Sequence, residues 1–226
     1  MSITWKLKVL QDWVEANRSQ DKQVAELPKS LSRSAFILNY HLRLARDAFA
    51  EFQRPDGNGD ELFIAMATFD PEFGKAALVH EANTIAAIHT VRNYADIFAQ
   101  LANKLVMPIP LPERDSTFSK VADKLPESAL KQGMSELNSS RWFRYLAAFS
   151  NISKHRRLLQ SKPTASFEEN TTGLRVEEFS FQFGPDEIDF PRMWAHDLLE
   201  ETYGVYRQIL LLGQVLNKQV LPPTHW

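Results

Sequence analysis

The sequence has 226 residues, of which 44% are hydrophobic, and its 26 basic and 28 acidic side chains give a net charge of −2. This balance excludes a polybasic, histone-like protein, and the absence of cysteine excludes a disulfide scaffold, a thiol nucleophile and cysteine-ligated metal sites. The 8 glycines and 12 prolines are too few for a low-complexity or collagen-like chain.

Apolar residues recur every three or four positions over most of the chain, which is the helical period. The first predicted helix covers about 4–17, and a second opens at Pro28 and Ser30 and ends before Pro55. A long third helix starts at Asp70, which is followed by a proline, a pair typical of a capped helix start. It ends near 107, and apolar residues from Leu78 to Leu105 form its buried stripe.

The second half of the chain is predicted to change from helix to strand and back. Residues 107–126 are rich in proline and carry one short helix near 118–125, and the helical pattern from 127 to 159 breaks near 138. After Pro163 the apolar period becomes 2, which predicts a β-hairpin over about 164–190 that turns at Gly184. We expect Phe179, Phe181 and Phe183 to pack this hairpin on the helices, and a last helix covers about 191–220.

These elements predict a mainly α-helical bundle with a small β-hairpin before its last long helix, organised as a single domain over 1–226. The longest uncharged stretches, such as 208–214 and 85–91, are far shorter than the ~20 apolar residues that cross a bilayer. Lys6 and Lys8 interrupt the start of the chain, so no signal peptide is expected. The prediction is therefore a cytoplasmic protein without a membrane partner.

The motif search points away from cofactors and metals. No glycine-rich phosphate loop occurs, and the zinc-helix pattern that begins at His80 has Thr84 where the second histidine is needed. Asp56 to Asp60 resembles the start of a calcium loop, but Glu61 and Ala67 stand where glycine and a bidentate glutamate are required. We therefore expect a turn there, and neither a metal nor a cofactor.

Charge is distributed unevenly along the second half of the chain. Residues 137–167 contain six basic and no acidic side chains, whereas 168–201 contain ten acidic side chains and two basic ones. Either the two segments neutralise each other in the fold, or the basic helix keeps one face free for a polyanion.

Within the basic segment, Asn151 and His155 are four residues apart and share a helix face with Arg144. An amide, an imidazole and cations gathered in this way can bind a phosphate, and the histidine can exchange a proton with it. The structural alternative is a histidine that bonds Asn151 and fills a polar gap between helices.

The segment Asn151-Ile-Ser-Lys-His155-Arg resembles the N-x-x-K-H-R signature of certain HEPN-like bacterial proteins. In this alignment His155 is the signature histidine, Asn151 is the polar residue, and Ser150 stands where an arginine is usual. The long preceding helix and the aromatic segment from Arg141 also fit, so that the likeness covers about 30–160 in architecture and eight residues in motif.

The resemblance implies a helical bundle and a metal-independent ribonuclease of bacterial defence or toxin–antitoxin systems, whose sites meet across a homodimer. His155 is then the general acid or base, with Asn151 beside it, while the RNA 2′-OH attacks the phosphate. The missing cation comes from Lys154, Arg156 or Arg144, or the domain is inactive. Arg144, Arg157 and Arg92 are the expected substrate-binding residues.

A second polar stripe on the preceding helix consists of His89, Arg92, Asn93 and Asp96. Buried against the Asn151–His155 face, it would orient His155 through Asp96 and supply Arg92 as the cation, whereas an exposed stripe is only a solvated helix side. Two alternatives to the nuclease stay open: a non-catalytic HEPN-like module that binds RNA, a nucleotide or a protein partner, and a plain helical interaction protein whose motif is structural.

Overall fold

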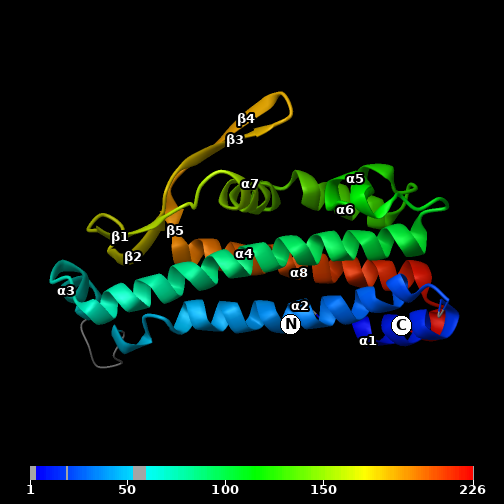
Figure 1. Ribbon diagram of the computed structural model, residues 1–226, viewed down its shortest axis with the longest axis horizontal. Helices are drawn as coiled ribbons and strands as arrows, with labels where there is room; N and C mark the ends of the chain where they lie inside the picture. The colour runs from blue at the N-terminus through cyan, green and yellow to red at the C-terminus, as the bar shows by residue number, and fades with distance from the viewer. Residues whose placement is uncertain (1–3, 19, 53–59, 226) are drawn as a thin grey trace. The chain divides into compact units, whose positions relative to one another are not determined.

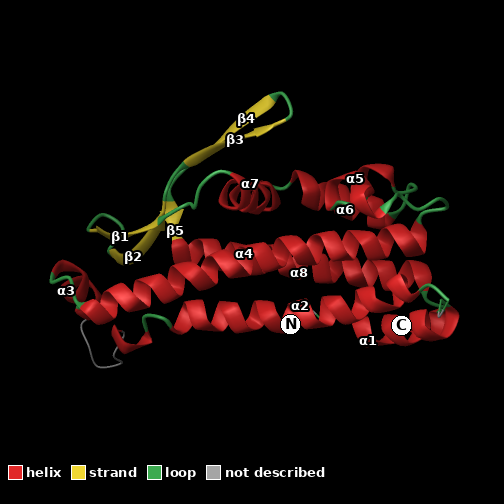
Figure 2. Ribbon diagram, in the orientation of Figure 1, coloured by secondary structure: helices red, strands yellow, loops and turns green. Residues whose placement is uncertain are grey.

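A computed structural model of the chain describes residues 4–18, 20–52 and 60–225 (Figure 1). This part of the chain is mainly helical, and small antiparallel sheets precede the last long helix, as predicted (Figure 2). Its eight α-helices are α1 (Leu7–Asn17), α2 (Lys22–Asp47), α3 (Glu61–Ala67), α4 (Pro71–Val106), α5 (Phe118–Lys124), α6 (Ala129–Ser139), α7 (Arg141–His155) and α8 (Ala195–Val220). Short 3-10 turns lie at Ala50–Phe52, Glu113–Asp115 and Pro223–His225.

Capping explains where the helices begin. Asp70 accepts the backbone N–H of Glu72 at 2.8 Å, so α4 starts as predicted, although Leu78 of the expected buried stripe is 65% exposed. The prediction that α2 opens at Pro28 is wrong, because Asp21 accepts the N–H of Val24 at 3.2 Å and starts the helix there. Pro28 lies inside α2, where it forgoes one backbone hydrogen bond.

One further helix and two further helix boundaries differ from the prediction. Helix α3 was not predicted, and the calcium-like turn just before it falls on residues 53–59, which lie outside the described residues. Helix α7 ends at His155, short of 159, because the N–H groups of Arg156 and Arg157 both turn back to the carbonyl of Ile152. Helix α8 begins at Ala195, later than predicted, because the preceding residues form a strand.

The predicted single hairpin is in fact two separate sheets. Strands β1 (Ser161–Ser166), β2 (Thr171–Val176) and β5 (Met193–Trp194) form one, in the order β1-β2-β5, and β3 (Phe179–Phe183) pairs with β4 (Asp186–Phe190) in the other. Phe181 lies opposite Ile188, and Gly184 makes the turn with a φ of +61°. The alternating pattern is therefore broken between Val176 and Phe179.

The backbone contacts group into two compact units, and the predicted single-domain organisation stays a prediction. Unit 1 comprises residues 1–37, 90–144 and 203–226, and unit 2 comprises 38–89 and 145–202. In unit 1 the Trp5 indole lies edge-on to Phe98, with ring centroids 5.8 Å apart, and donates to Asn217 at 2.9 Å. Trp5 and Asn217 thereby join the segment just before α1 to α8 within this unit.

The aromatic core of unit 2 decides how the β3–β4 hairpin packs. Phe179 is buried and contacts Tyr145 and Phe190, with ring centroids 5.2 and 5.0 Å apart. Phe181 and Phe183 are only half-buried and contact each other at 4.8 Å. The prediction that all three phenylalanines pack inward therefore holds for Phe179 alone, because the two-stranded sheet leaves its outer end uncovered.

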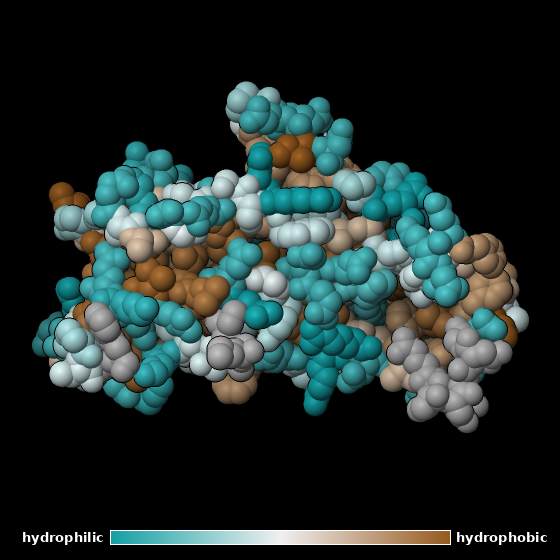
Figure 3. Space-filling view, turned by 180° about the vertical axis from the view of Figure 1, so that it is seen from behind, coloured by the Kyte–Doolittle hydropathy of each residue, from teal (hydrophilic) through white to brown (hydrophobic). Residues whose placement is uncertain are grey.

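Among the described residues, none of the helices combines the length and the apolar character that a membrane crossing needs. The face drawn in Figure 3 carries mainly hydrophilic side chains, with apolar atoms between them in separate places.

Candidate functional site

The helix α7 presents the predicted motif on its exposed side. The Ser140 hydroxyl accepts the N–H of Phe143 at 3.3 Å at the helix start, and Leu146, Phe149 and Ile152 are buried at helical spacing. Asn151, Lys154 and His155 lie on the other side and are exposed, as is Arg156 directly after the helix. We call Asn151, Lys154, His155 and Arg156 the α7 basic surface.

The exposure of His155 argues against the structural alternative for this residue. Asn151 donates from its Nδ2 to the carbonyl of Ala147 at 3.4 Å, so its amide turns to its own helix instead of to His155. His155 is the last residue of α7 and is exposed. Its imidazole is therefore accessible to a ligand and is not a buried packing element.

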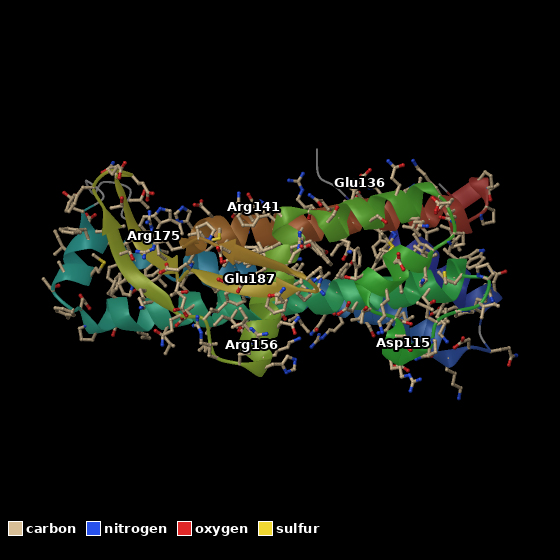
Figure 4. The ribbon with its side chains drawn as sticks, turned by 90° about the horizontal axis from the view of Figure 1, so that it is seen from above. Asp115, Glu136, Arg141, Arg156, Arg175 and Glu187 are labelled. Atoms are coloured by element: carbon tan, nitrogen blue, oxygen red, sulfur yellow. The ribbon has the colours of Figure 1, made fainter. Side chains whose placement is uncertain are left out.

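Arg156 and Arg157 are neighbours with different roles. The Arg156 guanidinium lies 5.4 Å from the centre of the half-buried Phe181 ring, and Figure 4 labels this arginine just beyond the end of α7. Arg157 donates from Nη1 to Oε1 of Glu177 at 2.5 Å, and Glu177 also accepts the N–H of Gln160 at 2.9 Å. Arg157, predicted to bind substrate, thus anchors the chain between α7 and β1.

The pKa of Glu177 is consistent with that anchoring role. Partial burial alone would raise this pKa, but the N–H of Gln160 and the guanidinium of Arg157 together hold it below its ordinary value. Glu177 is therefore charged at neutral pH and keeps Arg157 occupied.

His89, on α4, meets α7 through Ser150 and not through His155. His89 Nδ1 and Ser150 Oγ are 2.9 Å apart, and Ser150 is 5% exposed. Burial lowers the pKa of His89, and the charge of Lys154 lowers it further, so the ring is neutral at pH 7. Ser150, which stands where the resemblance expects an arginine, is thus part of the contact between α4 and α7.

The other members of the second stripe belong to unit 1, as does Arg144. Asp96 accepts the N–H of Phe118 at 2.9 Å and so caps α5. The Arg92 guanidinium lies over the Phe143 ring at 4.4 Å, and its buried Nη1 has no hydrogen-bond partner among the described residues. Burial lowers the pKa of Arg92, an effect that Asp96 opposes.

The predicted set is therefore only partly brought together. Unit 2 gathers the α7 basic surface, with Arg157 and His89 close by in the structure of that unit but engaged with Glu177 and Ser150. Asn93 is exposed, and Arg144 is half-buried.

A cavity in unit 2, lined by His80, His196 and Arg46 among others, was not predicted. Its charged side chains and histidines lie far apart in the sequence, on α2, α4 and α8, and no spacing pattern connects them. Among the lining residues, only His80 belongs to a chemical motif in the sequence, the incomplete zinc helix that has Thr84 at its second ligand position. Among the described residues, no group of three or more histidine, aspartate or glutamate side chains is placed to hold a metal ion.

Comparison of the chain with protein-family models, with curated proteins and with solved structures found no match.

Proposed function

We propose that the chain is a HEPN-like RNA-binding protein and that single-stranded RNA binds at the α7 basic surface and Phe181. The observation that carries this proposal is the exposure of Lys154, His155 and Arg156 together at one end of α7. Among the described residues, none of these three side chains forms an ion pair. The charges of Lys154 and Arg156 are therefore available to a polyanion, and the His155 imidazole is exposed between them in the sequence.

Two physical effects support RNA as that polyanion. Cations that neutralise phosphates release condensed counterions, which drives binding in a sequence-independent way. The half-buried Phe181 ring beside Arg156 offers a flat surface on which a base can stack, and stacking of this kind contributes about 1–3 kcal/mol per base.

RNA cleavage at the same surface is the more specific form of the proposal. An accessible His155 next to Lys154 and Arg156 has the groups that the reaction needs. A base removes the 2′-OH proton while that oxygen attacks phosphorus, an acid protonates the leaving 5′-oxygen, and a 2′,3′-cyclic phosphate results. Each copy supplies one histidine here, so we propose that a homodimer brings the second group.

One observation favours binding without cleavage. Ser150 is neutral and hydrogen-bonded to His89, so it does not supply the cation that the signature places at this position. A non-catalytic module that binds RNA, a nucleotide or a protein partner is thus the second candidate. A role in bacterial defence or a toxin–antitoxin system stays a prediction from the resemblance.

The test is an incubation of the purified protein with a 5′-fluorescein-labelled, 20-nucleotide single-stranded RNA in EDTA at low salt. Anisotropy measures binding and gel electrophoresis measures cleavage, for the wild type, for His155→Ala and for the control His41→Ala, which removes a histidine of α2 that bonds Asn83. Cleavage lost only in His155→Ala supports the nuclease, and binding without product supports the non-catalytic module. Absence of binding refutes both, and light scattering that shows a monomer refutes the two-copy site.

A further inference from the structure

The cavity in unit 2 has an apolar, buried floor and a charged mouth. Its volume is about 460 Å³, which is enough for a small organic molecule. Residues from α2, α3, α4, β2 and α8 line it, and those of the floor are buried: Phe49, Leu62, Leu174 and Leu199. An apolar floor of this size fits the apolar body of a ligand.

One polar side chain reaches this floor. His80 is 5% exposed, and its Nδ1 donates to the carbonyl of Ala45 at 2.8 Å. This bond fixes the tautomer, so Nε2 is the ring nitrogen left for a ligand. The bond to Ala45 is kept when Nε2 takes up a proton, and the ring then presents an N–H to the cavity without any rearrangement.

The mouth adds a second imidazole and a guanidinium, those of His196 and Arg46. His196 lies in the first turn of α8, whose N-terminal end carries a partial positive charge, and its imidazole is paired with Asp197 at 3.1 Å. The Arg46 guanidinium lines the cavity too and is held by Glu200, with Nη2 and Oε1 2.8 Å apart. Among the described residues that line the cavity, the charged or titratable groups besides His80 are Arg46, His196 and Glu200, and Asp197 is paired with His196.

We propose that this cavity binds a small organic oxyanion, a carboxylate or a phosphate monoester, with an apolar body on the floor and the anionic head between His80, His196 and Arg46. The Arg46 guanidinium only donates hydrogen bonds, as does His80 once its Nε2 has taken up a proton, which suits an anion and not a metal cation. The Glu200 carboxylate repels the anion and so lowers the affinity of the site for it. This site lies apart from the residues of the RNA-binding proposal and does not depend on it.

The proposal makes binding dependent on pH. Burial lowers the pKa of His80, and so does the neighbouring His196, so the free cavity holds neutral His80 at pH 7.5. An anion stabilises the protonated ring, so binding takes up a proton and strengthens as the pH falls.

The test is isothermal titration calorimetry with phenyl phosphate and benzoate, at pH 7.5 and 6.0, in two buffers of different ionisation enthalpy. We expect at least one probe to bind with proton uptake, and more tightly at pH 6.0; which probe binds identifies the phosphate or the carboxylate class. His80→Gln should weaken binding by on the order of tenfold and reduce the proton uptake that accompanies binding. Glu200→Gln should strengthen binding.

The control is His41→Gln, which removes a histidine of α2 that bonds Asn83 and does not line the cavity; its binding should equal that of the wild type. Arg46→Gln, an exposed rim substitution, should weaken binding even if His80→Gln fails to fold. The proposal is overturned if neither probe binds at millimolar concentration at pH 6.0. It is equally overturned if Arg46→Gln and every folded His80 variant bind like the wild type.

Discussion

Arg156 and Arg157 are adjacent in the sequence but should respond differently to removal of their charge. Arg156 lies against Phe181 and has no ion-pair partner among the described residues, whereas Arg157 is paired with Glu177. Arg156→Ala should therefore weaken RNA binding, because it removes a cation that contacts phosphate. Arg157→Ala should leave RNA binding close to that of the wild type and instead loosen the segment between α7 and β1.

The size of the effect follows from counterion release. Each phosphate contact adds about 0.7 to the slope of log K against log salt concentration for a single strand. One lost contact therefore makes the slope about 0.7 less steep. If the variant and the wild type bind equally at 1 M salt, the variant binds about fivefold more weakly than the wild type at 0.1 M salt. With Lys154 and Arg156 both contacting phosphates, these two cations should together contribute about −1.4 to the wild-type slope.

Fluorescence anisotropy titrations of a single-stranded RNA at four salt concentrations measure both quantities for the wild type and the two variants. The reasoning is refuted if Arg157→Ala flattens the salt dependence as much as Arg156→Ala does, or if neither variant changes it.

The remaining predictions concern stability. A Cβ on Gly213 would lie 2.2 Å from Cδ2 of Trp5, so Gly213→Ala should lower the free energy of unfolding by about 1–3 kcal/mol in urea titrations; an unchanged midpoint would contradict this packing. Phe179→Ala should cost about 3–5 kcal/mol, and a loss below 1 kcal/mol would mean that the hairpin does not pack as described. Burial lowers the pKa of His80 and His89 in the folded chain, so the unfolded chain binds more protons as the pH falls through about 6.5. The free energy of unfolding should therefore decrease between pH 7.5 and 5.5, and urea titrations that show an increase would contradict it.

The helices could be predicted where local chemistry and tertiary packing agree. The start of α4 follows from Asp70 and Pro71 alone, and the break between α6 and α7 follows from the serines before Arg141. The start of α2 could not be predicted from Pro28, because Asp21 caps the helix further upstream and outweighs one lost hydrogen bond.

The two-sheet arrangement depends on contacts that a local pattern does not contain. Apolar residues alternate up to Val176 and again from Phe179 to Phe183, with a shift of phase at Glu177 and Glu178. This pattern does not say which strands pair, and β2 pairs with β1 and β5, whereas β3 pairs with β4. The strand at Met193 forms because it pairs with the edge of β2. The later start of α8 therefore depends on this long-range pairing and could not be predicted from the local sequence.

Part of the candidate site could also be predicted from the sequence, and part could not. The exposed face of α7 follows from helical spacing, so the positions of Asn151 and His155 on one side could be predicted. The contact of His89 with Ser150 depends on which faces α4 and α7 turn to each other, and a single sequence does not contain this information. The cavity around His80 is still less accessible to prediction, because five elements build it.

The most direct test of the central claim is to map where RNA touches the chain. A single-stranded RNA with 4-thiouridine, photo-crosslinked to the wild-type protein and analysed by mass spectrometry, should attach to peptides that contain residues 151–156 and Phe181. Competition with excess unlabelled RNA should remove these crosslinks, and Arg156→Ala should reduce them. Crosslinks confined to peptides outside α7 and β3 would contradict the account.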